Sequence, residues 1–405
     1  MTTICLLMSC GLGLLSLTKP AFGQNYEQIA TQIVTTSAGV KPGDVVVITG
    51  GQYTLPLMEA VAVEVARAGG QANMLLTTDK AAHAELMDTP ETAIQADKSN
   101  NWLLQSDVLI TLPAYEDSRA VMAGVSPARQ AKFAQVATAS GINNKLDASK
   151  IRGVFVSYPS KSFAAAHQLD YPGYEQMMWS SIGADYTAIA GQAERLKQVL
   201  ATGHKMHITS PAGTDLTLSL GGRPVFTDDG VVSAADQQSP RVYDRTAALP
   251  GGRVYGTCQE TSATGRLAIA NDYITDGKPL TGFKADLQGG QLTNVRADAG
   301  ADAFQQQLAP YGPSAMQISN FSIGLNPLMK AQADKAFSPT TAAGMVYVRT
   351  GNNGLLGGQN TMPGGYGFPI ANATVEVDGK VLLRNGQLVD PAAASAAAAP
   401  RKSRK

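Results

Sequence analysis

Histidine is scarce in this chain of 405 residues, which contains four histidines and none after His207. No imidazole is therefore available beyond residue 207. An excess of one charge is also absent, because 32 basic residues balance 32 acidic ones. This balance argues against a protein that binds nucleic acid or is drawn to an anionic membrane, since both usually carry a basic excess.

Long hydrophobic runs are limited to the N-terminus, where residues 4–17 form an apolar run of signal-peptide length. Small residues around Gly23 allow cleavage there, so we predict a signal peptide over residues 1–23 and a secreted or periplasmic mature protein. No Lys or Arg precedes the run. A buried N-terminal helix and a lipoprotein signal cut at Cys10 therefore remain alternatives. No later stretch reaches the eighteen or so apolar residues of a membrane span.

Cysteine is also rare, with three in the whole chain. Cys5 and Cys10 would leave with the signal peptide, so the mature chain would keep only Cys258. No internal disulfide can then form.

The first half of the mature chain alternates strand and helix patterns. The expected strands are residues 45–48, 72–76, 107–112 and 153–157, the first a continuous β-branched run typical of a buried parallel strand. Residues 55–68 carry apolar side chains at helical spacing and end at Gly69-Gly70. This pattern predicts a doubly wound α/β domain over residues 24–201.

The second half has a different sequence pattern, in which short expected strands alternate with Gly-rich turns. Alternating apolar and polar residues predict antiparallel strands near residues 204–210, 215–220, 253–255, 267–269, 373–377 and 380–383. Asp378-Gly379 reads as a two-residue hairpin turn. Helices are expected over 298–308 and 327–336. We predict an α+β domain over residues 202–390 and a disordered Ala/Pro-rich tail over 391–405.

Three local features have simple structural readings. Gly50-Gly51 lacks the G-x-G-x-x-G and Walker spacings, so a tight turn explains it better than nucleotide binding. His204 and His207 are three apart in an expected strand and should face opposite sides, which prevents them from sharing a metal ion. Cys258 lies near Glu260, and a neighbouring carboxylate raises a thiol pKa, so a buried, unreactive thiol is expected.

An ordered set of motifs in the second half resembles the aminopeptidase T family of thermophilic metallopeptidases. These motifs are Gly213–Leu216 with Gly222-Arg223, Leu249–Tyr255 leading to Glu260, Ile323–Pro327, Gly351–Asn353 with Gly357-Gly358, and Thr374–Gly379. Val40–Val46 and Tyr158-Pro159 extend the resemblance to about residues 26–390. It implies an N-terminal α/β domain, a C-terminal catalytic domain and a possible homodimer.

The resemblance also implies five ligands for a pair of divalent metals, namely two Glu, two His and one Asp. Glu260 matches the first Glu, but Asn320 and Tyr347 stand at the next two positions, and the final pair falls near Gly365 and Gly367. Amide and phenol groups are poor substitutes for a carboxylate and an imidazole. We therefore expect no metal cofactor.

The resulting prediction is a metal-free relative that binds a small molecule or peptide, without nucleic-acid partners. Its cleft should lie in the C-terminal domain, with Glu260 as the one candidate catalytic residue and Glu260 either paired with a new partner or near solvent. Five further residues are expected to bind ligand: Asn320, Tyr347, Asn353, Asn360 and Tyr366. One alternative is an active hydrolase or other enzyme with a site rebuilt from Glu260, Asp272, Tyr347 and Tyr366. Another is an unrelated periplasmic binding protein.

Overall fold

The computed structural model describes residues 25–95, 103–139, 145–146, 148–273, 278–362 and 364–389. The expected signal peptide over residues 1–23, with Cys5 and Cys10, and the expected tail over 391–405 lie outside these residues. Within the described part of the chain, no helix is both long and apolar enough to cross a bilayer.

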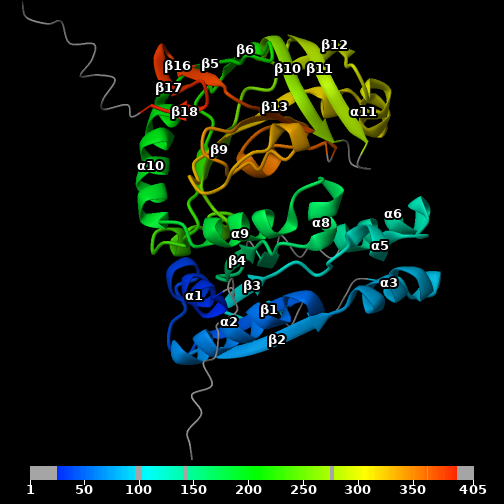
Figure 1. The fold of residues 1–405 in the computed structure, drawn as a ribbon, viewed down its shortest axis with the longest axis vertical. Coiled ribbons are helices and arrows are strands. Elements are labelled where there is room, and N and C mark those ends of the chain that lie inside the picture. The colour runs from blue at the N-terminus through cyan, green and yellow to red at the C-terminus, as the bar shows by residue number, and fades with distance from the viewer. Residues whose placement is uncertain are drawn as a thin grey trace, which may run out of the picture.

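The first half contributes four strands to a five-stranded parallel sheet in the order β2-β1-β3-β4-β8, and Figure 1 shows the first four side by side. The four strands predicted in this half are confirmed as β1 (Val45–Gly51), β2 (Gln71–Thr77), β3 (Val108–Thr111) and β4 (Arg152–Val156). The helices are α1 (Tyr26–Thr31), a π-helix (Gln32–Ser37), α2 (Leu55–Arg67), α3 (Asp79–Asp88), α5 (Ser118–Met122), α6 (Pro127–Ala139), α8 (Lys161–Ala166), α9 (Tyr171–Ile182) and α10 (Tyr186–Thr202).

Local sequence accounts for several of these boundaries. Val46, Val47 and Ile48 are almost fully buried, as a β-branched run in a central strand should be. Gly69 has a φ of +81° just after α2, the left-handed conformation with which glycine ends helices. The side chains of Asp170 and Asp185 accept N–H bonds at the starts of α9 and α10.

The fifth strand of the parallel sheet comes from the second half of the chain, which amends the predicted division at residues 201/202. β8 (Thr246–Leu249) pairs in parallel with β4. The completely buried Arg245 holds its start by donating hydrogen bonds to the carbonyls of Leu146, Ser149 and Ile151. The sequence Thr-Ala-Ala-Leu has little β-propensity, so the pattern gave no sign of this strand.

The second half forms two antiparallel sheets, and the predicted fold class of α/β followed by antiparallel α+β is confirmed. Their strand orders are β12-β11-β10-β6-β5-β16-β17-β18 and β15-β14-β13-β9-β7. The strands are β5 (Lys205–Thr209), β6 (Asp215–Ser219), β7 (Val225–Asp228), β9 (Arg253–Thr257), β10 (Thr264–Tyr273), β11 (Pro279–Gln288), β12 (Gln291–Arg296), β13 (Ile318–Gly324), β14 (Val346–Thr350), β15 (Gly367–Ile370), β16 (Thr374–Val377), β17 (Lys380–Arg384) and β18 (Gln387–Leu388). The buried rings of Phe283, Phe304 and Phe368 join these sheets to helix α11 (Ala301–Leu308).

The turn and helix predictions in this half have mixed outcomes. Asp378 and Gly379 both have positive φ between β16 and β17, so the hairpin turn is confirmed. The helix expected over 327–336 is wrong, because only a 3₁₀ turn forms at Ala333–Lys335. The buried amide of Asn326 donates to two backbone carbonyls, and its oxygen accepts the N–H of Leu328, which fixes a turn where the helix would begin.

Candidate functional site

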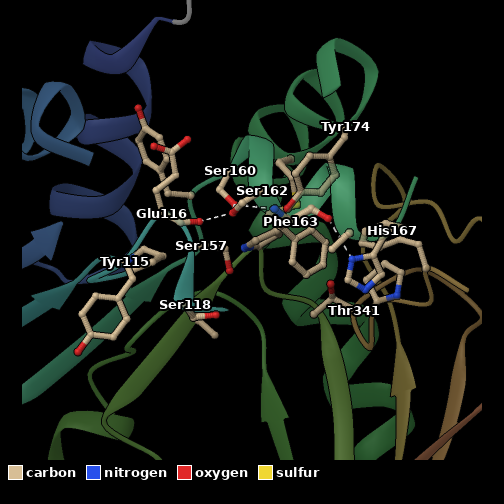
Figure 2. Close-up of a pocket in the computed structure, with 18 of the residues that line it drawn as sticks. Tyr115, Glu116, Ser118, Ser157, Ser160, Ser162, Phe163, His167, Tyr174 and Thr341 are labelled. Carbon is tan, nitrogen blue, oxygen red and sulfur yellow. Dashed lines mark hydrogen bonds between the residues drawn. The ribbon is translucent and has the colours of Figure 1, made fainter. Parts of the chain in front are cut away.

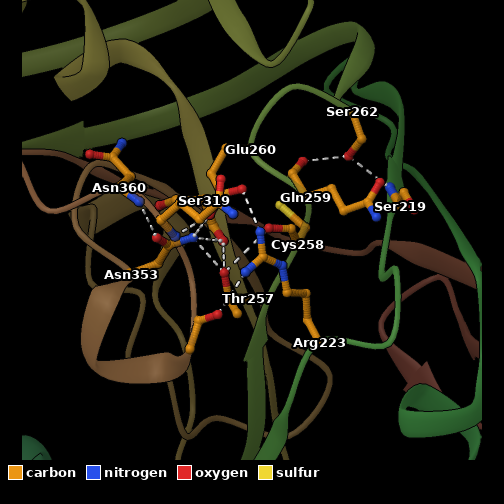
Figure 3. Close-up of polar contacts among 12 residues, drawn as sticks. Ser219, Arg223, Thr257, Cys258, Gln259, Glu260, Ser262, Ser319, Asn353 and Asn360 are labelled. Carbon is orange, nitrogen blue, oxygen red and sulfur yellow. Dashed lines mark hydrogen bonds and ion pairs between the residues drawn. The ribbon is translucent and has the colours of Figure 1, made fainter.

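Glu260, three residues beyond the end of β9, has both carboxylate oxygens engaged by the protein (Figure 3). Oε1 accepts the backbone N–H of Gln359 at 2.7 Å and the amide of Asn353 at 2.9 Å. Oε2 accepts a hydrogen bond from the Arg223 guanidinium at 2.7 Å, which forms an ion pair. The new partner that the sequence led us to expect for Glu260 is therefore Arg223.

Asn353 connects this ion pair to the surrounding backbone. It is 1% exposed, and its amide also lies 2.5 Å from the Thr257 hydroxyl. Its oxygen accepts the N–H of Asn360 at 2.9 Å. A Cβ at Gly358 would come within 2.0 Å of the Asn353 side chain, so the loop can close only with glycine there.

The charge state of the site follows from these contacts. Burial alone would raise the pKa of Glu260, but the N–H of Gln359, the Asn353 amide and Arg223 together leave that pKa below its ordinary value. Glu260 is therefore an anion at neutral pH. Cys258 is completely buried, and burial followed by the Glu260 charge raises the pKa of its thiol to about 12. This thiol is unsuited to act as a nucleophile near neutral pH.

Tyr347 and Tyr366 belong to a different neighbourhood around Asp272. The Tyr366 hydroxyl donates to Asp272 at 2.7 Å, whereas the Tyr347 hydroxyl donates to the carbonyl of Ser338. Burial raises the pKa of both phenols, and Asp272 raises it further. Both hydroxyls therefore remain protonated at neutral pH.

Asn320 lies on β13 and is 8% exposed. Its amide donates to the carbonyl of Asn352 at 3.0 Å, while its side-chain oxygen has no hydrogen-bond partner in the described part of the protein.

The two positions to which the resemblance assigns the last ligands differ in the space they leave for a side chain. A Cβ at Gly365 would meet the carbonyl oxygen of Thr350 at 2.3 Å. A Cβ at Gly367 would make tight contacts of 3.3–3.4 Å with the side chains of Arg349 and Tyr347, which a small shift of those side chains would relieve. A histidine at 365 would require the backbone to move.

A polar cleft of about 520 Å³ lies beside the Glu260 network. Its lining includes Glu260 and Asn360 of the predicted site, together with Arg223, Gln359, Gln317 and Met362. Of the other predicted residues, Asn353 supports the cleft by holding Glu260, and Asn320, Tyr347 and Tyr366 are not among its walls. Arg223 had been singled out only within the Gly222-Arg223 motif, and nothing in the local sequence indicated Gln359.

The two neighbouring histidines do not converge on one site. His207 lies 2.8 Å from Asp215, whereas His204 lies 3.5 Å from Asp378. The expectation that they do not share a metal agrees with this arrangement.

The residues at the positions where the resemblance places the family's metal ligands do not fit a pair of divalent ions. The one remaining carboxylate is satisfied by three donors, one of them a guanidinium that would repel a cation. In the described residues, no group of three or more His, Cys, Asp or Glu side chains is arranged to hold a metal ion. No reaction step through a metal can be derived from this arrangement.

The fold and the motif order define an aminopeptidase-like protein of mixed α/β architecture. The family model for the thermophilic metalloproteases (M29) matches residues 22–327, and the chain belongs to that family. A search of curated protein sequences finds no match.

Two solved structures share the fold at low sequence identity. Wild-type AmpT from Thermus thermophilus is 16% identical with a TM-score of 0.70, over 90% of this chain and 99% of that one. The 2,5-dihydroxypyridine dioxygenase from Pseudomonas putida KT2440 is 15% identical with a TM-score of 0.57, over 94% and 98% of the two chains. At these identities the likeness concerns the fold alone.

Proposed function

We propose that this protein is an exported member of the M29 family that binds a small molecule or peptide without metal-dependent peptidase activity. The supporting observation is the ion pair between Arg223 and Glu260, the one carboxylate among the residues that the sequence comparison places at the family's ligand positions. The ligand would occupy the 520 Å³ cleft beside this pair. Export through the N-terminal apolar segment and assembly as a homodimer are parts of the same proposal.

The ion pair supports this function because it places a positive charge against the carboxylate that a metal ion would need. Arg223 and Glu260 have side chains only 18% and 11% exposed, so the pair is shielded from water. A divalent ion at Glu260 would share one carboxylate with three hydrogen-bond donors, one of them a guanidinium whose charge repels the ion. The binding free energy of a single such ligand is far below that of a five-ligand site.

Metal analysis of purified mature protein tests the proposal. After incubation with zinc, cobalt, manganese or iron and removal of free ions, we expect no stoichiometric metal by mass spectrometry. We also expect no hydrolysis of leucyl anilide with any of these ions. Glu260→Gln is the matched variant, because it removes the remaining carboxylate while keeping the shape of the side chain.

One metal ion held per chain by the natural protein, but absent from the Glu260→Gln protein, would contradict the proposal. Metal that persists unchanged in the variant would also contradict it, since a site elsewhere would then hold the ion.

The second candidate is an enzyme with a rebuilt site, and the hydrogen bond between Tyr366 and Asp272 favours it. A phenol held against a carboxylate is a possible proton donor to substrate. Hydrolysis lost in Tyr366→Phe but retained in Glu260→Gln would support this candidate over the first.

A further inference from the structure

A second, larger cavity lies outside the Glu260 cleft, between the parallel sheet and the loops of the C-terminal half (Figure 2). Its volume is about 850 Å³. Pro113 follows β3, Ser157 follows β4 and Pro250 follows β8, and all three line the cavity. The cavity therefore covers the carboxyl ends of the parallel strands.

This placement is the one where open α/β sheets usually bind ligands. In the order β2-β1-β3-β4-β8, the chain reverses direction along the sheet between β1 and β3. Loops leaving two neighbouring strands there run in opposite directions and open a crevice. Tyr53, after β1, and Tyr115, after β3, lie on either side of that switch point and line the cavity.

Aromatic rings form much of the cavity wall. Phe163 stacks on His167 with ring centroids 4.2 Å apart and on Tyr174 at 5.5 Å, and Figure 2 shows its ring between them. Phe337 meets Tyr174 edge-on at 5.8 Å. Tyr115 and Phe163 are 38% and 39% exposed, which is unusual for large apolar side chains and leaves ring surface open to a bound molecule.

The cavity wall carries more carboxylates than arginine side chains. Three lining carboxylates, Glu116, Asp117 and Asp228, face two lining arginines, Arg119 and Arg253. Asp228 is neutralised by Arg253 at 3.1 Å. Asp117 is used to cap α5. The carboxylate of Glu116 makes no hydrogen bond or ion pair in the described part of the chain.

The field beside Tyr53 is also negative. Burial raises the pKa of the Tyr53 hydroxyl, and the carboxylates of Glu116 and Asp79 raise it further. Asp79 lies behind the wall, where it accepts the backbone N–H groups of Glu116 and Asp117. Aromatic faces next to an unpaired carboxylate attract cations, especially a cation attached to an aromatic ring.

The geometry points to a second ligand site in this cavity, for a small molecule that combines an aromatic ring with a protonated amine. The ring packs among Phe163, Tyr174 and Phe337, and the ammonium group lies against Glu116. This site is independent of the Glu260 cleft and requires no metal.

Calorimetric titration of the mature protein with three matched compounds tests the inference. We expect 2-phenylethylamine to bind at least about fivefold more tightly than the uncharged 2-phenylethanol, and 3-phenylpropionate to bind most weakly. Glu116→Gln should reduce the preference for the amine over the alcohol to less than about twofold. Phe163→Leu should weaken the amine and the alcohol alike, because both present a ring to the same wall.

Glu59→Gln is the matched control, since Glu59 lies on α2 and does not line the cavity. It should leave all three affinities unchanged. Equal binding of alcohol and amine, a preference that survives Glu116→Gln, or no heat at about 10 mM amine would each overturn the inference. Circular dichroism of each variant separates a lost site from a lost fold.

Discussion

At the scale of single residues, Glu260 couples the stability of the protein to pH. Its pKa in the folded chain is below the ordinary value of about 4.3. The stabilising contribution is therefore complete above that ordinary value and is lost as the pH falls through the lower folded value. Glu260→Gln lacks this contribution.

We expect the difference in unfolding free energy between the natural protein and Glu260→Gln to be largest near neutral pH and to shrink below about pH 4. Urea denaturation across a pH series measures it. Glu85→Gln, at an exposed position of α3, should show no such trend. A constant difference across the series would show that Glu260 does not titrate at a lowered pKa.

The chemistry of a residue could be predicted from the sequence only where it depends on composition or on neighbouring residues, and not on contacts between distant segments. The absence of histidine after His207 and the shielded thiol of Cys258 were both apparent before the fold was known. The ion pair was not, because Arg223 and Glu260 are 37 residues apart and meet through the pairing of β7 with β9 and the loop that contains Asn353. The hydrogen bond between Tyr366 and Asp272 was not apparent for the same reason, since the two residues lie 94 positions apart.

At the scale of elements, the hairpin between β11 and β12 supports the loop of Glu260 through two adjacent glycines. Gly289 and Gly290 have φ values of +56° and +80°. A Cβ at Gly290 would lie 1.7 Å from the carbonyl oxygen of Glu260, whereas a Cβ at Gly289 would meet nothing within 4 Å. An alanine at position 289 therefore tests backbone strain alone, whereas an alanine at position 290 tests backbone strain together with a steric clash.

Gly289→Ala should lower the unfolding free energy by about 1 kcal/mol, the cost of a left-handed alanine. Gly290→Ala adds displacement of the Glu260 backbone, and we expect a loss of about 3 kcal/mol. Urea denaturation of the two variants compares them directly. Equal losses would mean that the hairpin moves freely away from Glu260.

Elements with a strong burial pattern were predicted well. Val45–Ile48 is apolar on both faces, as expected of a strand that is covered on both sides. Apolar and polar residues alternate along β16 and β17 on either side of a turn, as expected of strands with one exposed face. The failures involve long-range contacts. The helix expected over 327–336 does not form, because a turn begins at Asn326. The side chain of Asn326 is held by hydrogen bonds to residues 75 and 145 positions away.

At the scale of the whole molecule, β8 makes the two halves of the chain depend on one another. A fragment of residues 24–201 lacks the fifth strand and leaves the edge of β4 unpaired. We expect this fragment to show no cooperative urea transition. Extending it to residue 252 should restore hydrogen-exchange protection to the amides of β4. A cooperative transition in the shorter fragment would contradict this interdependence.

The pairing of β8 with the first sheet also determines when that sheet can be completed during synthesis of the chain. Chains usually fold domain by domain as they leave the ribosome, with the N-terminal domain first. Here the first sheet stays open until residue 249 has emerged, after β5, β6 and β7 have already been released. At that point β5 and β6 can pair with each other, whereas β7 still lacks its partner β9. The open edge of β4 and the unpartnered β7 are therefore exposed together during that interval, when wrong pairing between the halves is possible.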